Sequence, residues 1–81
     1  MEEVGRISHY FNRIGVAAVV LKKPLKVGDR IRIKGSKTDF EQIVESMEIN
    51  NKKVDTAMPG DEVGIKVMDK VRKKDIVYRL D

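Results

Sequence analysis

The sequence predicts a small all-β domain spanning residues 1–81, because short alternating stretches recur along it and two of them follow a Gly-Asp pair. The first is PLKVGDRIRIKG, residues 24–35, and the second is MPGDEVGIKV, residues 58–67. The chain has no cysteine, so disulfides and thiolate metal ligands cannot stabilise it. A closed sheet or a tight helical bundle must therefore stabilise so short a chain.

Both Gly-Asp pairs are predicted to be turns that begin a half-buried strand. Gly28 and Gly60 supply a backbone angle that other residues adopt only with strain, and the carboxylates of Asp29 and Asp61 can accept nearby backbone N–H groups. After the first turn, residues 30–34 alternate isoleucines with cations. After the second turn, the expected strand has Val63, Ile65 and Val67 on its inner face and Gly64 and Lys66 on the other.

Three further strands follow from the same reasoning. Residues 4–11 are expected to form the first, and NRIG, residues 12–15, the hairpin turn after it. The continuous apolar run VAAVVL, residues 16–21, suits a strand that is covered on both faces or rolled into a barrel. The polar turn RKKD, residues 72–75, precedes a final strand over residues 76–80.

Residues 38–50 allow two interpretations. Phe40, Ile43, Val44 and Met47 have helical spacing, and Thr38 to Glu41 fit a capping box that favours a helix from the local pattern. As a strand, residues 43–49 would place Ile43, Met47 and Ile49 on one face.

Composition and charge narrow the range of partners and locations. The formal net charge is +4, and acidic and basic residues are interleaved rather than clustered, which is milder than in a dedicated DNA-binding domain. The amino terminus opens acidic, unlike a signal peptide, and residues 16–21 fall far short of the roughly 20 apolar residues of a membrane helix. We expect a soluble, cytoplasmic protein.

The sequence carries no catalytic or metal-binding pattern. KGSK, residues 34–37, lacks the order and spacing of a phosphate-binding loop. His9 is the one histidine, and Ser8 beside it would point to the opposite face of a strand, so no nucleophile–base pair is expected. We therefore expect no enzymatic activity, no metal and no cofactor.

The order of these elements resembles the second domain of the translational GTPases, the β-barrel that follows the GTPase domain in elongation factor Tu. The resemblance also extends to the barrel at the carboxyl end of collagenase-like peptidases that act in RNA modification. It implies a closed antiparallel barrel of about six strands and makes residues 43–49 a strand. The matching elements are Asn12 to Gly15, Leu25 to Asp29, Val44 to Met47, Val54 to Ile65, and Arg72 to Asp75.

The resemblance implies a non-catalytic module that binds tRNA or ribosomal RNA. Aromatic rings beside cations suit stacked bases and phosphates. Leu21-Lys22-Lys23 replaces the Gly-Arg pair and acidic residue common in that family, so no aminoacyl pocket is transferred. The RNA-binding candidates are Arg6, His9, Tyr10, Phe11, Arg13, Lys22, Lys23, Lys52, Lys53 and Arg72.

The alternative is a protein-docking barrel for a separately encoded GTPase-like or peptidase-like partner. An apolar outer patch would then form the contact, with Ile14, Met58 and Met68 as candidates.

Overall fold

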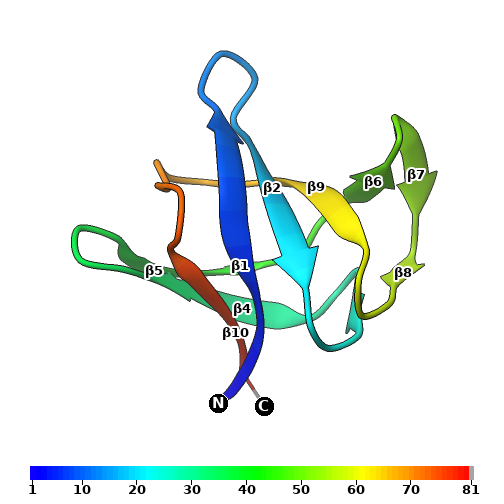
Figure 1. The fold of residues 1–81 in the computed structure, drawn as a ribbon, viewed down its shortest axis with the longest axis horizontal. Helices are drawn as coiled ribbons and strands as arrows, with labels where there is room; N and C mark the ends of the chain where they lie inside the picture. Colours follow the sequence, from blue (N-terminus) through cyan, green and yellow to red (C-terminus); the bar gives the residue numbers. More distant parts are fainter. Residues whose placement is uncertain (81) are drawn as a thin grey trace.

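The computed structural model describes residues 1–80, which form ten strands joined in antiparallel pairs and no helix (Figure 1). The all-β prediction is confirmed. The strands are β1 (Glu2–Phe11), β2 (Val16–Leu21), β3 (Leu25–Lys26), β4 (Arg30–Lys34), β5 (Asp39–Ile43), β6 (Met47–Ile49), β7 (Lys52–Val54), β8 (Thr56–Ala57), β9 (Glu62–Lys66) and β10 (Ile76–Leu80).

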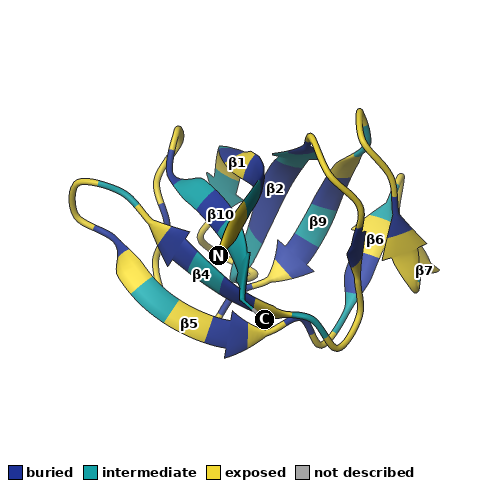
Figure 2. Ribbon diagram, turned by 90° about the horizontal axis from the view of Figure 1, so that it is seen from below, coloured by how far each residue is buried: buried dark blue, intermediate teal, exposed yellow. Residues whose placement is uncertain are grey.

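Eight strands form one sheet in the order β5-β4-β10-β1-β2-β9-β6-β7, and β3 pairs with β8 in a second sheet. The large sheet curls, so that its inner face lines an apolar core while exposed residues alternate with buried ones along β4 (Figure 2). β1 and β10 lie side by side, with Glu2 opposite Arg79 (Figure 1). The largest fully buried side chains include Ile7, Leu25, Ile31, Ile33, Met47 and Ile65.

The closed barrel of about six strands is not confirmed, because the ladders among residues 1–80 do not join β5 to β7. A buried side chain of β5 contacts the end of β9 instead. The Gln42 amide of β5 donates to the carbonyl of Lys66 at 2.9 Å and accepts the N–H of Met68 at 2.8 Å. A side chain therefore links the first strand of the sheet to the end of β9.

Residues 38–50 contain two strands with a break between them, so the helical interpretation is wrong and the predicted strand over residues 43–49 is right only in its last part. The physical reason lies in the backbone of Val44, which bonds to the turn at residues 28–29 rather than continuing β5. This redirects the chain, so that Ile43 is 43% exposed while Val44 is fully buried. The carbonyl of Thr38, the proposed helix cap, instead closes the β4–β5 turn by accepting the N–H of Gly35 at 2.7 Å.

Both Gly-Asp turns are confirmed. Gly28 and Gly60 have φ angles of 99° and 93°, which favour glycine because it has no Cβ. The carboxylates of Asp29 and Asp61 each accept the backbone N–H three residues earlier, at 3.0 and 2.9 Å. These contacts fix the points at which β4 and β9 begin.

The basic turn before β10 has the same construction without a glycine. Asp75 accepts the N–H of Arg72 at 2.8 Å, and Lys74 takes the position of positive φ at 80°. Asp75 is also buried against Gly35, where a Cβ would lie 1.9 Å from the Asp75 Oδ1 atom. One turn design therefore recurs three times.

Candidate functional site

The aromatic residues predicted to bind RNA point to opposite faces of β1. Tyr10 packs against the core, whereas Phe11 is 46% exposed. The ring of His9 meets that of Phe11 edge to face, with centroids 4.4 Å apart. Phe11 and His9 thus form a small outward aromatic pair, and Tyr10 is not part of it.

The predicted cations are spread over the molecule. Arg6 and Lys22 line a shallow hollow of about 270 Å³, where Lys22 pairs with Glu3 at 3.3 Å. Lys52 and Lys53 lie on β7, which three strands separate from β1 in the sheet. The rest lie in connections: Arg13 in the β1–β2 turn, Lys23 after β2, and Arg72 before β10.

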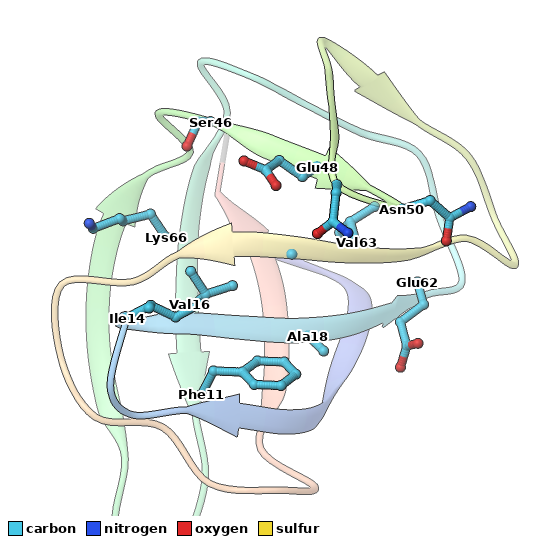
Figure 3. Close-up of a pocket in the computed structure, with 12 residues that line it drawn as sticks. Phe11, Ile14, Val16, Ala18, Ser46, Glu48, Asn50, Glu62, Val63 and Lys66 are labelled. Atoms are coloured by element: carbon cyan, nitrogen blue, oxygen red, sulfur yellow. The ribbon is translucent and has the colours of Figure 1, made fainter.

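An open groove of about 570 Å³ lies on the outer side of β2 and β9 (Figure 3). We call it the outer groove and define it by its floor, Ala18 and Gly64, and by its two walls, which contain Phe11 and Glu48. Phe11 belongs to the β1–β2 hairpin and Glu48 to the β6–β7 hairpin, so the groove runs between two hairpins.

The floor of the outer groove consists of small residues that face each other across the β2–β9 ladder. Ala18 lies opposite Gly64, and His9 lies opposite Ala18 on the other side. A Cβ on Gly64 would meet only the Val16 side chain at 3.3 Å and the carbonyl of Glu48 at 3.9 Å. Outside Gly64 and its two neighbours in the chain, no backbone atom therefore lies closer than 3.9 Å to the position of a Cβ on Gly64, and the nearest atom belongs to the Val16 side chain.

The groove carries two carboxylates and one ammonium group. Glu62 and Lys66 lie on β9 at opposite ends of the groove, and Glu48 lies on its far wall (Figure 3). The hydroxyl of Ser8, at a bulge in β1, donates its one hydrogen to Glu62 at 2.6 Å, and the carbonyl of Ala18 lies 3.2 Å from the same oxygen. The charged lining is net negative in a protein of net charge +4.

Sequence reasoning missed the acidic wall and the floor. It placed Gly64 and Lys66 on the outer face of β9, which the structure confirms. A glycine inside a strand often marks a bulge or a close approach of another group, and this signal could have identified the floor. Glu48 gave no signal, because its position depends on β6 lying beside β9.

A different outer face, that of β4 and β5, is covered by ion pairs. The Arg32 guanidinium donates to both oxygens of Asp39 at 2.7 and 2.8 Å, and Arg30 approaches Glu41 at 3.4 Å. The hydrogen bond from Arg32 lowers the pKa of Asp39 below its ordinary value. We call this surface the ion-paired face.

The apolar residues proposed for protein docking are all exposed but do not form one patch. Ile14 is 61% exposed and lies in the wall of the outer groove. Met68 is 76% exposed and follows Val67, whose N–H bonds to the carbonyl of Gly15 beside Ile14. Met58 lies near the other end of β2, where Gly60 bonds to the carbonyl of Leu21.

Within residues 1–80, no group of three or more histidine, cysteine, aspartate or glutamate side chains is arranged to hold a metal ion. The Ser8 hydroxyl is engaged by Glu62 and the carbonyl of Ala18. Across the same residues the structure has no helix that is long and apolar enough to cross a membrane.

No protein-family model matches the sequence, but curated proteins do. The chain is 42% identical over 79 residues to an uncharacterized protease of Methanocaldococcus jannaschii, covering 96% of this chain and 19% of that protein. It is 38% identical over 80 residues to a collagenase of Porphyromonas gingivalis, covering 96% of this chain and 22% of the collagenase. The chain therefore spans about a fifth of the length of these relatives.

Solved structures show the same fold. The carboxyl-terminal domain of a Geobacillus thermoleovorans protein classed as a U32 peptidase superposes with a TM-score of 0.92 at 22% identity, covering 99% of this chain and 93% of that domain. The selenomethionine form of that domain gives a TM-score of 0.91 at 22% identity, over 96% of this chain and 99% of that domain.

These findings correct the predicted function. The interpretation as an RNA-binding module of the elongation factor type is wrong, because the relatives found are proteases. The geometry gives a physical reason, since the two carboxylates and one ammonium group that line the groove beside Phe11 are net negative, which disfavours phosphate. The barrel of elongation factor Tu is not confirmed as the parent fold. The chain is related to a segment of collagenase-type proteases and has the fold of the carboxyl-terminal domain of a U32-class protein.

Proposed function

We propose that residues 1–81 form a single non-catalytic domain that docks onto a collagenase-like peptidase. One observation carries this proposal: a protease of M. jannaschii contains a segment 42% identical to 96% of this chain, and the match makes up 19% of that protease. In such a protein most of the chain is available for peptide hydrolysis, and this segment supplies a surface.

The structure supports a docking role in two ways. Its apolar core is continuous across both sheets, which suits a unit that folds as one body. On the outside, Phe11 and Ile14 are exposed at one groove wall. Exposed apolar side chains around a hollow are common where another protein binds.

The test uses the M. jannaschii protease from which the matching segment has been removed. Titration calorimetry should show one 81-residue chain bound per protease molecule with a dissociation constant of about 1 μM to 1 mM, corresponding to roughly 8 to 4 kcal/mol. An unrelated small β domain of similar charge serves as the control. Absence of a complex, at concentrations well above this range, contradicts the proposal.

The same preparation tests the proposal that this domain has no catalytic activity of its own. We expect the 81-residue chain alone to release no peptide from gelatin, whereas adding it to the truncated protease should change the rate or substrate range of that protease. Hydrolysis by the chain alone would contradict the proposal.

A further inference from the structure

We infer that the outer groove binds an extended segment of the partner peptidase that carries an apolar side chain next to a lysine or arginine. This inference rests on the proposed function and names the site and the chemistry of the contact.

The apolar half of the inference rests on the floor of the groove. Ala18 is only 9% exposed although it lies on the outer face, and Gly64 opposite it has no side chain. The Phe11 ring lies along this floor, beside Ala18 (Figure 3). A leucine or methionine side chain placed over Gly64 would contact Phe11 and Val16 and remove both from water.

The charged half rests on Glu48 and Glu62. Glu48 is exposed, lies directly opposite Gly64 in the β6–β9 ladder, and takes part in none of the ion pairs among residues 1–80. Lys53 opposes Glu48 across the β6–β7 ladder, but no ion pair joins them. The groove lining carries Glu48, Glu62 and Lys66 and is therefore net negative, so charge complementarity favours a segment that places a cation beside an apolar side chain.

The shape of the groove favours an extended chain. The groove follows β9, a strand of five residues, which spans about 17 Å at roughly 3.3 Å per residue. A segment of about five extended residues would therefore lie between the two hairpins. Alternate side chains would point down to the floor, and those between them would reach the carboxylates of the rim.

The experiment titrates the ¹⁵N-labelled 81-residue chain with three blocked peptides: Ac-KLKLK-NH2, Ac-ELELE-NH2 and Ac-KSKSK-NH2. We expect saturable shifts of the Phe11, Val16 and Gly64 amides with the first peptide, at least about tenfold weaker binding of the acidic one, and none of the serine peptide. Equal binding of the acidic peptide, or shifts centred elsewhere, would overturn the inference. Stronger shifts of the same amides by an oligouridine would also overturn it.

Two surface variants with matched controls locate the contact. Glu48→Lys should weaken binding of the basic peptide about tenfold, while Glu45→Lys, which reverses an exposed charge outside the groove, should leave it unchanged. Phe11→Ala should weaken binding by a similar factor, and Ile43→Ala, equally exposed on β5, should not. Indifference to both groove variants contradicts the inference.

The same variants separate the inference from the proposed function. If the truncated protease binds the Glu48→Lys and Phe11→Ala variants as tightly as the unaltered chain, the docking function stands and the groove is rejected. If the protease binds neither the unaltered chain nor the variants, while the basic peptide still binds in the groove of the unaltered chain, the docking function fails and the peptide site stands.

Discussion

Two outer faces of one sheet differ in how their strands use the outward positions. On the ion-paired face, Arg30 and Arg32 of β4 form ion pairs with Glu41 and Asp39 of β5, so these four charges are paired within the surface. Over β2 and β9 the central outward positions are Ala18 and Gly64, and the flanking Glu48 has no ion pair within residues 1–80. The arginines of the first face are paired, whereas the second face has a floor of small residues and an exposed carboxylate without an ion pair.

Gln42 links these two regions, and its replacement should have the largest effect. Gln42→Leu removes the partners of the Lys66 carbonyl and the Met68 N–H. The free energy of unfolding should fall by about 1–3 kcal/mol, the usual cost of unpaired backbone groups. Urea denaturation measures this, with Ile43→Ala on the same strand as a control that should change little. An unchanged midpoint would show that the bridge contributes nothing.

A side chain added in the outer groove should weaken peptide binding, whereas the same side chain added on the ion-paired face should not. A strand backbone without positive φ accepts a side chain at Gly64, and the nearest atom is the movable Val16 Cγ1. Gly64→Leu should therefore fold and weaken binding of Ac-KLKLK-NH2 about tenfold, corresponding to about 1.4 kcal/mol. Lys34→Leu adds the same side chain to the ion-paired face and should not alter peptide binding. An equal effect of both changes would remove the distinction between the faces.

Replacing the glycine in the turn before β4 or before β9 should lower the stability of the fold equally, although the two strands belong to different faces. Gly28→Ala and Gly60→Ala each place a Cβ at positive φ where no atom lies within 4 Å. The loss is therefore purely conformational, about 1 kcal/mol each. Lys74→Gly in the third turn should stabilise by up to about 1 kcal/mol, because it relieves the same strain. Thermal unfolding compares the three, and opposite signs for Gly28 and Gly60 would contradict a common design.

The ion pair at Asp39 should have the smallest effect, because both partners are solvated. Arg32 holds the pKa of Asp39 below its ordinary value, so the folded form gains stability above about pH 3.9, the unfolded pKa. This gain is lost as the pH falls through the folded pKa. Asp39→Asn should remove that part of the pH dependence and change little at pH 7. A large loss of stability at pH 7 would contradict this, because it would show that the exposed ion pair contributes strongly to folding.

Local sequence signals predicted most of the strands and turns. Alternation in residues 30–34 and the Gly-Asp pairs depend on neighbours in the chain, and both predictions are confirmed. Residues 38–50 could not be resolved in this way, because the break at Val44 comes from a hydrogen bond to a distant turn. The contact between Gln42 and the end of β9 escaped prediction for the same reason, because it joins residues far apart in the chain.

The candidate site was harder to predict than the fold. Phe11 was expected to contact a partner, and it does line the groove, but for an RNA ligand that the relatives do not support. The cationic candidates were chosen by residue type alone, which says nothing about whether they share a surface. Glu48 and Glu62 line one groove because β6, which carries Glu48, pairs with β9, which carries Glu62.

The position of β10 sets the order in which this molecule can be assembled. It fills the space between β1 and β4, and Glu2 contacts Arg79 across 77 positions of the chain. Contacts between such remote residues form late, since the intervening chain must first be brought together. β10 can therefore enter the sheet only after all the strands before it have been synthesised, and until then β1 and β4 would expose unpaired edges that invite aggregation.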